Sequence, residues 1–282
     1  LIGDIAQWLT GEKLVFASEP KGLLQDPTVP VEPDPEALHH YLTFGYVPSP
    51  RSAFKGVHKL PPAHYLLARE GRVRVERYWS LHYRPKLRMS EGELGEELLA
   101  RLREAVRLRM ISDVPLGAFL SGGIDSSTIV ALMSECSAGP VKTFSIGFEE
   151  EAYNELPYAR LVAERYATDH HEFIVKPDAV AVLPELVWHY NEPYADSSAI
   201  ATYYLAKMTR EHVTVALNGD AGDENFAGYE RYLANRLAAR YDRLPRPLRR
   251  SVESTFALLP ALGPRRGLYR RSKRFFAAVG QE

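Results

Sequence analysis

The stretch that decides the fold is FLSGGIDSST, residues 119–128. An apolar run ending at Leu120 precedes two glycines, and an acidic, hydroxyl-rich segment then leads into the apolar run STIVALMSEC. A strand, a glycine turn and a helix in this order bring backbone N–H groups to a helix N-terminus, where they attract anions. The stretch therefore predicts a phosphate-binding loop.

The side chains of this loop narrow the kind of phosphate site. Gly122 and Gly123 would let the backbone approach phosphates closely. Further hydroxyl donors come from Ser121, Ser126, Ser127 and Thr128. Asp125 repels a bare phosphate and therefore implies an intervening cation, for which Mg²⁺ is the natural choice. The lysine of the Walker loop is missing, which argues against a kinase or GTPase. The plain alternative is a turn that only connects a strand to a helix.

A second loop has a related composition. The stretch VALNGDAGDENFAGY, residues 215–229, places Asp220, Asp223 and Glu224 among glycines, directly after an apolar run that ends near Asn218. Three close carboxylates repel one another unless a cation or a proton relieves them. Ligands of open parallel sheets bind at the carboxyl ends of the strands, so we expect both loops to meet there. A solvated turn is the alternative.

The surrounding pattern predicts an α/β fold with a parallel sheet covered by helices. Strand-like runs cover residues 117–120, 141–148, 170–175 and 213–218, and helix-like runs cover 157–167 and 198–209. Ser90 and Glu93 form a capping-box signature, and an apolar stripe from Leu94 to Met110 predicts a helix after it. The first eighty residues are β-rich, with a short helix over 35–43 and a hairpin around Glu70-Gly71.

Composition excludes few function classes. The chain has 282 residues and a net charge of −1. It has no apolar run long enough to cross a bilayer and one cysteine, Cys136, so we predict a cytoplasmic protein without membrane or nucleic-acid partners. Positions 231–282 are strongly basic, which we interpret as a solvated helical face or a surface for acidic protein.

Several motifs together resemble the asparagine synthase family of the glutamine-hydrolysing type. The motifs are DVPLGAFLSGGIDSS (113–127), TFSIGFEE (143–150), TDHHEFIV (168–175), EPYADSSAIATYYLAK (192–207), LNGDAGDENFAGYERY (217–232) and the upstream FGYVPSPRSAFKGVHKLPPAHYLL (44–67). SGGIDSS is similar to the pyrophosphate-binding PP-loop of N-type ATP pyrophosphatases, whose domain is adenine nucleotide alpha hydrolase-like. Residues 1–82 resemble the C-terminal part of a type 2 glutaminase domain with an N-terminal nucleophile. Residues 83–282 resemble the synthetase domain, C-terminally truncated and ending in the basic helical tail 231–282.

The resemblance implies a reaction. ATP would activate the side-chain carboxylate of aspartate as β-aspartyl-AMP with release of pyrophosphate, and ammonia, derived from glutamine in the full-length family, would then displace AMP to give asparagine. The ATP contacts it implies are Leu120, Ser121, Gly122, Gly123, Asp125, Ser126, Ile146, Asn218 and Gly219. Asp125 and Asp223 would bind magnesium-pyrophosphate, and Asp220 would serve formation of the acyl-adenylate with Asp223. The family pattern also allows a homodimer.

The chain departs from the family pattern at several positions. Asn218 stands where serine is usual, Ala221 where glycine is usual and Asn225 where an apolar residue is usual. The family's glutaminase uses an N-terminal cysteine, whereas this chain begins with Leu1, and Cys136 lies inside a helix-like run without a free amine. We therefore expect no glutamine hydrolysis from this chain, which resembles an internal fragment or a truncated reading frame.

Two other functions stay open at this stage. A β-lactam synthetase-like enzyme would share the nucleotide motifs but adenylate another carboxylic acid. A catalytically inactive nucleotide-binding fragment would keep the fold without turnover. For substrate or loop contacts the further candidates are Glu155, Glu192 and Asp196, with helix capping as an alternative for Asp196. His170, His171 and Glu172 lack the spacing of a zinc helix, so no metal site is expected there.

Overall fold

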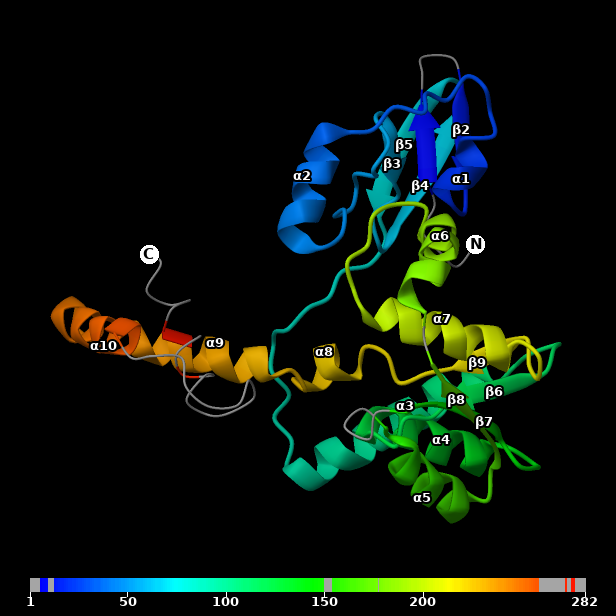
Figure 1. The fold of residues 1–282 in the computed structure, drawn as a ribbon, viewed down its shortest axis with the longest axis vertical. Coiled ribbons are helices and arrows are strands. Elements are labelled where there is room, and N and C mark those ends of the chain that lie inside the picture. Colours follow the sequence, from blue (N-terminus) through cyan, green and yellow to red (C-terminus); the bar gives the residue numbers. More distant parts are fainter. Residues whose placement is uncertain are drawn as a thin grey trace.

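The computed structural model describes residues 6–9, 13–149, 154–176, 178–258, 272 and 275–276. These residues form a β-rich N-terminal part and a larger α/β part (Figure 1). A segment without helix or strand, between Arg77 and Glu91, connects the two parts. Part of the predicted basic tail, including the arginines at 265, 266, 270 and 271, lies outside the described residues.

The N-terminal part is built from short antiparallel strands and two helices. Its elements are β1 (Ala6–Leu9), β2 (Leu14–Ala17), α1 (Pro20–Leu23), α2 (Pro35–Phe44), β3 (Val57–Lys59), β4 (His64–Arg69) and β5 (Arg72–Arg77). β1 pairs with β2 and with β3, while β4 and β5 form the predicted hairpin. The turn residues Glu70 and Gly71 have φ angles of 50° and 73°, as a two-residue hairpin turn of type I′ requires.

The α/β part alternates strands with helices as far as β9. Its elements are α3 (Glu91–Arg109), β6 (Leu116–Phe119), α4 (Ile124–Cys136), β7 (Lys142–Phe148), α5 (Leu156–Tyr166), β8 (Asp169–Val175), α6 (Ala179–Tyr190), α7 (Ser198–Thr209), β9 (Val215–Leu217), α8 (Gly222–Phe226), α9 (Glu230–Tyr241) and α10 (Arg246–Leu258). The strands are ordered β8-β7-β6-β9, and all neighbours are parallel. The predicted α/β class with a parallel, helix-covered sheet is confirmed.

The core lies between this sheet and the helices α3, α4 and α5. It consists of Val106, Ala118, Leu120, Val130, Leu132, Met133, Val141, Ala159 and Ala163, all buried. Phe144, in the middle of β7, has no exposed surface. Because the strand that precedes the glycine turn is buried among these side chains, the turn is held at a fixed position on the edge of the sheet.

The helix α3 begins with the predicted capping box. The Ser90 amide donates to Glu93 Oε2 at 2.7 Å, and the Glu93 amide donates to Ser90 Oγ at 3.4 Å. The predicted apolar stripe is only partly buried, because Val106 lies in the core while Leu94 and Leu98 each keep 39% of their surface exposed. The predicted helix is thus present, and the C-terminal half of its stripe, from Leu102 to Met110, packs against the core.

The basic helices α9 and α10 project away from the sheet (Figure 1). Their exposed leucines are Leu233, Leu237 and Leu248. Arg249 forms an ion pair with Asp242 at 2.9 Å, which links the end of α9 to α10. In the described part of the chain, no helix combines the length and the apolar character needed to span a bilayer.

Candidate functional site

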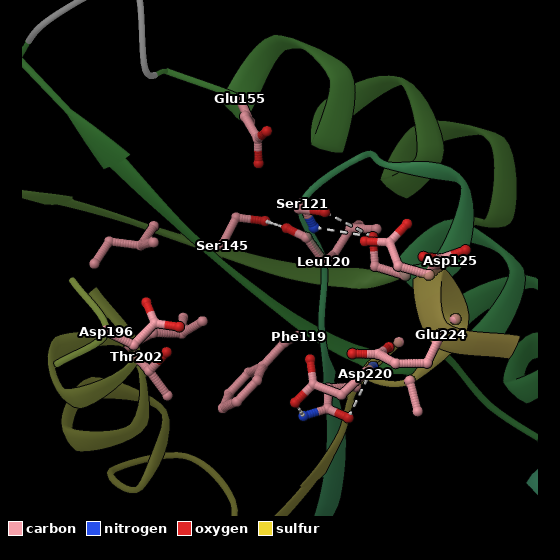
Figure 2. A pocket seen from close by; sticks show the side chains of 18 of the residues that line it. Phe119, Leu120, Ser121, Asp125, Ser145, Glu155, Asp196, Thr202, Asp220 and Glu224 are labelled. Atoms are coloured by element: carbon pink, nitrogen blue, oxygen red, sulfur yellow. Dashed lines mark hydrogen bonds between the residues drawn. The ribbon is translucent and has the colours of Figure 1, made fainter. Parts of the chain in front are cut away.

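The carboxyl ends of β6 and β9 lie side by side and place two loops around one cavity. Ala118 of β6 is paired with Leu217 of β9, so the chain leaves both strands at the same edge of the sheet. The cavity has a volume of about 660 Å³ (Figure 2). Of the predicted site residues, it is lined by Leu120, Ser121, Asp125, Ser126, Ile146, Asn218, Gly219, Asp220 and Asp223. Gly122 and Gly123 do not belong to its lining.

The two loops touch at Asp125. A Cβ atom on Gly219 would lie 2.7 Å from the Ser126 amide nitrogen and 2.9 Å from Asp125 Cβ. A Cβ atom on Gly222 would lie 2.5 Å from Asp125 Oδ2 and 2.8 Å from Oδ1. These distances are shorter than side-chain contacts allow, so glycine at both positions is what permits the acidic loop to reach the start of α4.

Hydrogen bonds within the first loop hold its shape. The Ser121 amide donates to Ser126 Oγ at 3.2 Å, the two serine hydroxyls lie 2.9 Å apart, and the Gly123 amide donates to Ser121 Oγ at 3.2 Å. The predicted hydroxyls of Ser127 and Thr128 do not line this cavity. Thr128 instead donates to Ile124 O at 2.8 Å. The first turn of α4 keeps backbone N–H groups without an intrahelical acceptor, which suits an anion.

Gly122 has a packing role in addition to the predicted one. Its φ of 80° lies in the left-handed region, and an added Cβ would lie 2.5 Å from backbone and side-chain atoms of Tyr158. Glycine is therefore needed for the turn and for its packing against the start of α5. The close approach of its backbone to phosphates stays a prediction.

The cavity is strongly acidic. Its carboxylates are Asp125, Glu155, Asp196, Asp220, Asp223 and Glu224, while its lining contains no lysine, arginine or histidine among the described residues. No described lysine or arginine comes within 4.0 Å of the Asp125, Asp220 or Asp223 carboxylates. A polyanion would be repelled here unless a cation accompanies it.

Two of these carboxylates fit a magnesium ion shared with a phosphate. Asp125 and Asp223 come from different loops and both line the cavity. The described residues contain no group of three histidine, cysteine or acidic side chains arranged for a metal. Mg²⁺ commonly takes one or two protein carboxylates and completes its shell with substrate phosphates and waters. Asp125 and Asp223 are therefore residues of the type that could hold Mg²⁺ together with a phosphate.

Asn218, Ala221 and Asn225, which depart from the family pattern, form hydrogen bonds within the second loop. Asn218 Nδ2 donates to Asp220 Oδ2 at 2.7 Å, and Asn225 Nδ2 donates to Ala221 O at 2.6 Å. Ala221 has a φ of 70°, a left-handed conformation that glycine adopts with less strain. The asparagine at 218 thus orients Asp220, although it stands where the family pattern has a hydroxyl.

The opposite wall comes from the α6–α7 loop and from α7. It contributes Tyr194, Asp196, Thr202 and Leu205. Figure 2 shows Asp196 and Thr202 across the cavity from Asp125 and Glu224. The Asp196 carboxylate accepts a hydrogen bond from the Ser198 amide at 2.9 Å, which lowers the pKa of Asp196. It therefore accepts a hydrogen bond from the first residue of α7 and also faces the cavity, while its contact with a substrate stays a prediction.

Sequence reasoning missed several lining residues. Phe119, Tyr194, Thr202 and Leu205 line the cavity, and Ser145 donates a hydrogen bond to Leu120 O. Tyr194 and Thr202 lie within the quoted motif at 192–207, which was the available signal. Their position opposite the loops follows only from the packing of α7 on β7. Of the three further candidates, Glu155 lines the cavity, whereas Glu192 does not.

Two family models match the chain. The model described as asparagine synthase matches residues 97–279, and the model described as glutamine amidotransferase domain matches residues 6–79. The first therefore covers most of the α/β part, and the second covers most of the N-terminal part.

Curated relatives agree with these matches. Asparagine synthetase (glutamine-hydrolyzing) 1 of Bacillus subtilis is 34% identical over 251 residues, which cover 88% of this chain and 39% of that protein. Putative asparagine synthetase (glutamine-hydrolyzing) 2 of Methanocaldococcus jannaschii is 38% identical over 246 residues, which cover 85% of this chain and 47% of that protein. The chain thus spans less than half the length of these relatives.

A more distant curated relative and a solved structure also match. The protein named Amidase chyE, from Penicillium rubens, is 34% identical over 210 residues, covering 67% of this chain and 31% of that protein. Among solved structures, NMN synthetase from Francisella tularensis matches with a TM-score of 0.33 and 18% identity, over 50% of this chain and 59% of that one. From the motifs, the cavity at the strand ends and the extent of the family match, we conclude that the chain belongs to the asparagine synthase family.

Proposed function

We propose that the chain provides the nucleotide site of an ATP-dependent ligase that forms asparagine, AMP and pyrophosphate from aspartate, ATP and ammonia. An oxygen of the aspartate side-chain carboxylate attacks the α-phosphorus, and the bond from that phosphorus to the bridging oxygen breaks to release pyrophosphate. Ammonia then attacks the acyl carbon, the acyl C–O bond breaks, AMP leaves with the electron pair, and the nitrogen loses a proton. An ionised carboxylate is a poor electrophile, so adenylation makes the second step feasible.

The contact between the two loops at Asp125 is the observation that carries this proposal. It brings the first turn of α4 and the acidic 218–224 loop onto one cavity of about 660 Å³. The α4 amides suit phosphate oxygens, and the acidic loop suits a cation that accompanies them. A simple connecting turn would require neither the glycines at 219 and 222 nor the shared cavity.

The residues take distinct roles in this proposal. Leu120, Ser121 and Ser126 form the phosphate end of the cavity, and Ile146 contacts the adenosine. Asp125 and Asp223 would hold Mg²⁺, which would supply positive charge against the triphosphate and the pyrophosphate. Asp220, oriented by Asn218, serves the adenylation step, with Gly219 beside it at the ribose or α-phosphate.

Exchange of labelled pyrophosphate into ATP tests the proposal. The full-length protein should catalyse exchange only when both Mg²⁺ and aspartate are present, because the reverse of adenylation needs the acyl-adenylate. Absence of exchange in a folded protein that binds ATP with Mg²⁺ would favour a nucleotide-binding protein without turnover. Absence of both binding and exchange would refute the proposed site.

A second candidate adenylates a different carboxylic acid, as a β-lactam synthetase-like enzyme does. The nucleotide motifs do not select the acid, and one matched relative, at 34% identity over 67% of this chain, is named an amidase and not an asparagine synthetase. Release of AMP should then depend on another acid. A panel of carboxylic acids, compared with aspartate at equal concentration, separates the two.

We also propose the division of the chain at residues 82 and 83. The glutamine amidotransferase match ends at residue 79, and the asparagine synthase match begins at residue 97. The proposed boundary falls in the segment without helix or strand between β5 and α3. Ammonia supply, a homodimer and a cytoplasmic location stay predictions from the sequence.

A further inference from the structure

The N-terminal part holds the loop between α6 and α7, residues 191–197, at several points. Three backbone or side-chain atoms of the loop accept or donate hydrogen bonds across this contact. The bonds with normal lengths are Lys21 N to Asn191 Oδ1 at 2.9 Å, Ala53 N to Glu192 Oε2 at 3.1 Å and Ala195 N to Gly45 O at 2.8 Å. In addition, Lys59 Nζ forms an ion pair with Glu192 Oε1.

The ion pair of Lys59 and Glu192 is largely buried. Their side chains keep only 15% and 14% of their surface exposed. Lys59 Nζ also donates to Val47 O at 2.9 Å, so the ammonium group is held on both sides. Removing one partner of a buried ion pair leaves an uncompensated charge, whereas an exposed pair contributes little. The exposed pair of Lys55 and Glu32, at 62% and 59%, provides a matched comparison in the same part.

The same loop carries two residues of the cavity wall. Tyr194 and Asp196 line the cavity. Glu192, two residues before Tyr194, does not line it and instead contacts Ala53 and Lys59 of the N-terminal part. The Asp196 carboxylate accepts a hydrogen bond from the Ser198 amide at the start of α7, and α7 supplies Thr202 to the same wall. The Tyr194 ring stacks on Tyr190 at the end of α6, with the ring centroids 4.7 Å apart. A displacement of Glu192 would therefore be passed to this wall.

We propose that Lys59 is a positioning residue for the cavity: through Glu192 it fixes the α6–α7 loop so that Tyr194 and Asp196 face the bound substrates. This role rests on the proposed function of the site. Lys59 touches neither the cavity nor the reacting atoms, and it acts only through the loop. Through Lys59, the β-rich N-terminal part would stabilise the wall of the cavity in which adenylation is proposed to take place.

The test compares Lys59→Met with Lys55→Met in the full-length protein. The first measurement is amide hydrogen exchange of peptides covering 191–197, with peptides of β1 to β3 reporting whether the N-terminal part stays folded. The second is the KM and kcat of pyrophosphate exchange. Lys59→Met should speed amide exchange of the loop and lower kcat/KM by about ten- to a hundredfold, as expected when a wall of a reaction site shifts by about an ångström. Lys55→Met should leave both unchanged.

Lys59→Arg is the conservative variant, because it keeps a cation opposite Glu192. It should restore most of the kcat/KM that Lys59→Met loses. If Lys59→Met unfolds β1 to β3, Lys59→Gln replaces it, since the amide can still donate to Glu192 without the charge, and the same directions are expected.

The outcomes separate this inference from the proposed function. Unchanged amide exchange in 191–197 for a folded Lys59→Met or Lys59→Gln variant overturns the inference, whatever the activity. Faster loop exchange with unchanged kcat/KM also overturns it, because the contact would then be structural only. If the unmodified protein catalyses no pyrophosphate exchange, the proposed function fails. The loop measurement, together with calorimetric titration of ATP and Mg²⁺, then still decides whether Lys59 sets the shape of the cavity.

Discussion

Gly222→Ala tests directly whether Asp125 holds a cation in the cavity. The φ angle of Gly222 lies outside the left-handed region, so alanine can adopt the same backbone conformation. The added Cβ would lie 2.5 Å from Asp125 Oδ2, so the carboxylate must retreat until the contact reaches at least 3.4 Å. Metal–ligand distances tolerate roughly 0.2 Å, and a lost charge-assisted contact costs about 1.5–3 kcal/mol. We therefore expect kcat/KM for Mg²⁺ and ATP in pyrophosphate exchange to fall about ten- to a hundredfold.

Controls separate this effect from a general loss of structure. Gly139→Ala adds a methyl group where nothing lies within 4 Å, and it should leave exchange unchanged. Asp125→Asn removes the charge itself, so Gly222→Ala should add little to the Asp125→Asn variant if both act through the same carboxylate. A folded Gly222→Ala variant with kcat/KM within about twofold of the unmodified protein, or effects that simply add with Asp125→Asn, would refute the assignment of Asp125 as a metal ligand.

Three more predictions concern the metal, the stability and the pH dependence. Asp223→Asn should raise the Mg²⁺ concentration needed for half-maximal exchange; unchanged Mg²⁺ dependence would exclude Asp223 as a ligand. Ala167 ends α5 with a φ of 49°, so Ala167→Gly should raise the free energy of unfolding in urea by about 0.5 kcal/mol, and a decrease would contradict the strain argument. Burial lowers the pKa of His170 below 6.5, so its neutral form is favoured by folding. The stability that the protein gains from the neutral form of His170 is fully present above pH 6.5 and is lost as the pH falls below that value. His170→Gln should therefore lose less stability than the unmodified protein between pH 7 and about pH 5.5, as urea unfolding at both values would measure.

The alternation of short apolar runs with helix-like runs was sufficient to predict the α/β class. The helix over 198–209 and the capping box at Ser90 were predicted with correct bounds or contacts, because both depend on local sequence. The helix α6, Ala179–Tyr190, was not predicted. Its sequence AVAVLPELVWHY contains Pro184 and little polar periodicity, so helix and buried strand cannot be distinguished locally.

Some residues of the candidate site could likewise be predicted from the local sequence, whereas others depend on tertiary packing. The two glycine-rich loops were recognisable because anion sites and cation sites need particular residue types at strand ends. The role of Gly122 was not, since it depends on Tyr158 of another helix. The wall with Tyr194 and Thr202, and the contact of Lys59 with Glu192, depend on how distant elements pack, which neither spacing nor composition encodes.

The pairing of β6 with β9 also bears on how the protein is made. Leu116 pairs with Val215, and everything from α4 to α7 intervenes in the chain. Contacts between such distant segments form slowly, because the intervening chain must first be ordered. During synthesis the first loop leaves the ribosome well before its acidic counterpart, so the cavity is absent until β9 has docked. A nucleotide that binds only the completed sheet would stabilise the folded chain by mass action, and maturation of the chain would then depend on the supply of that nucleotide.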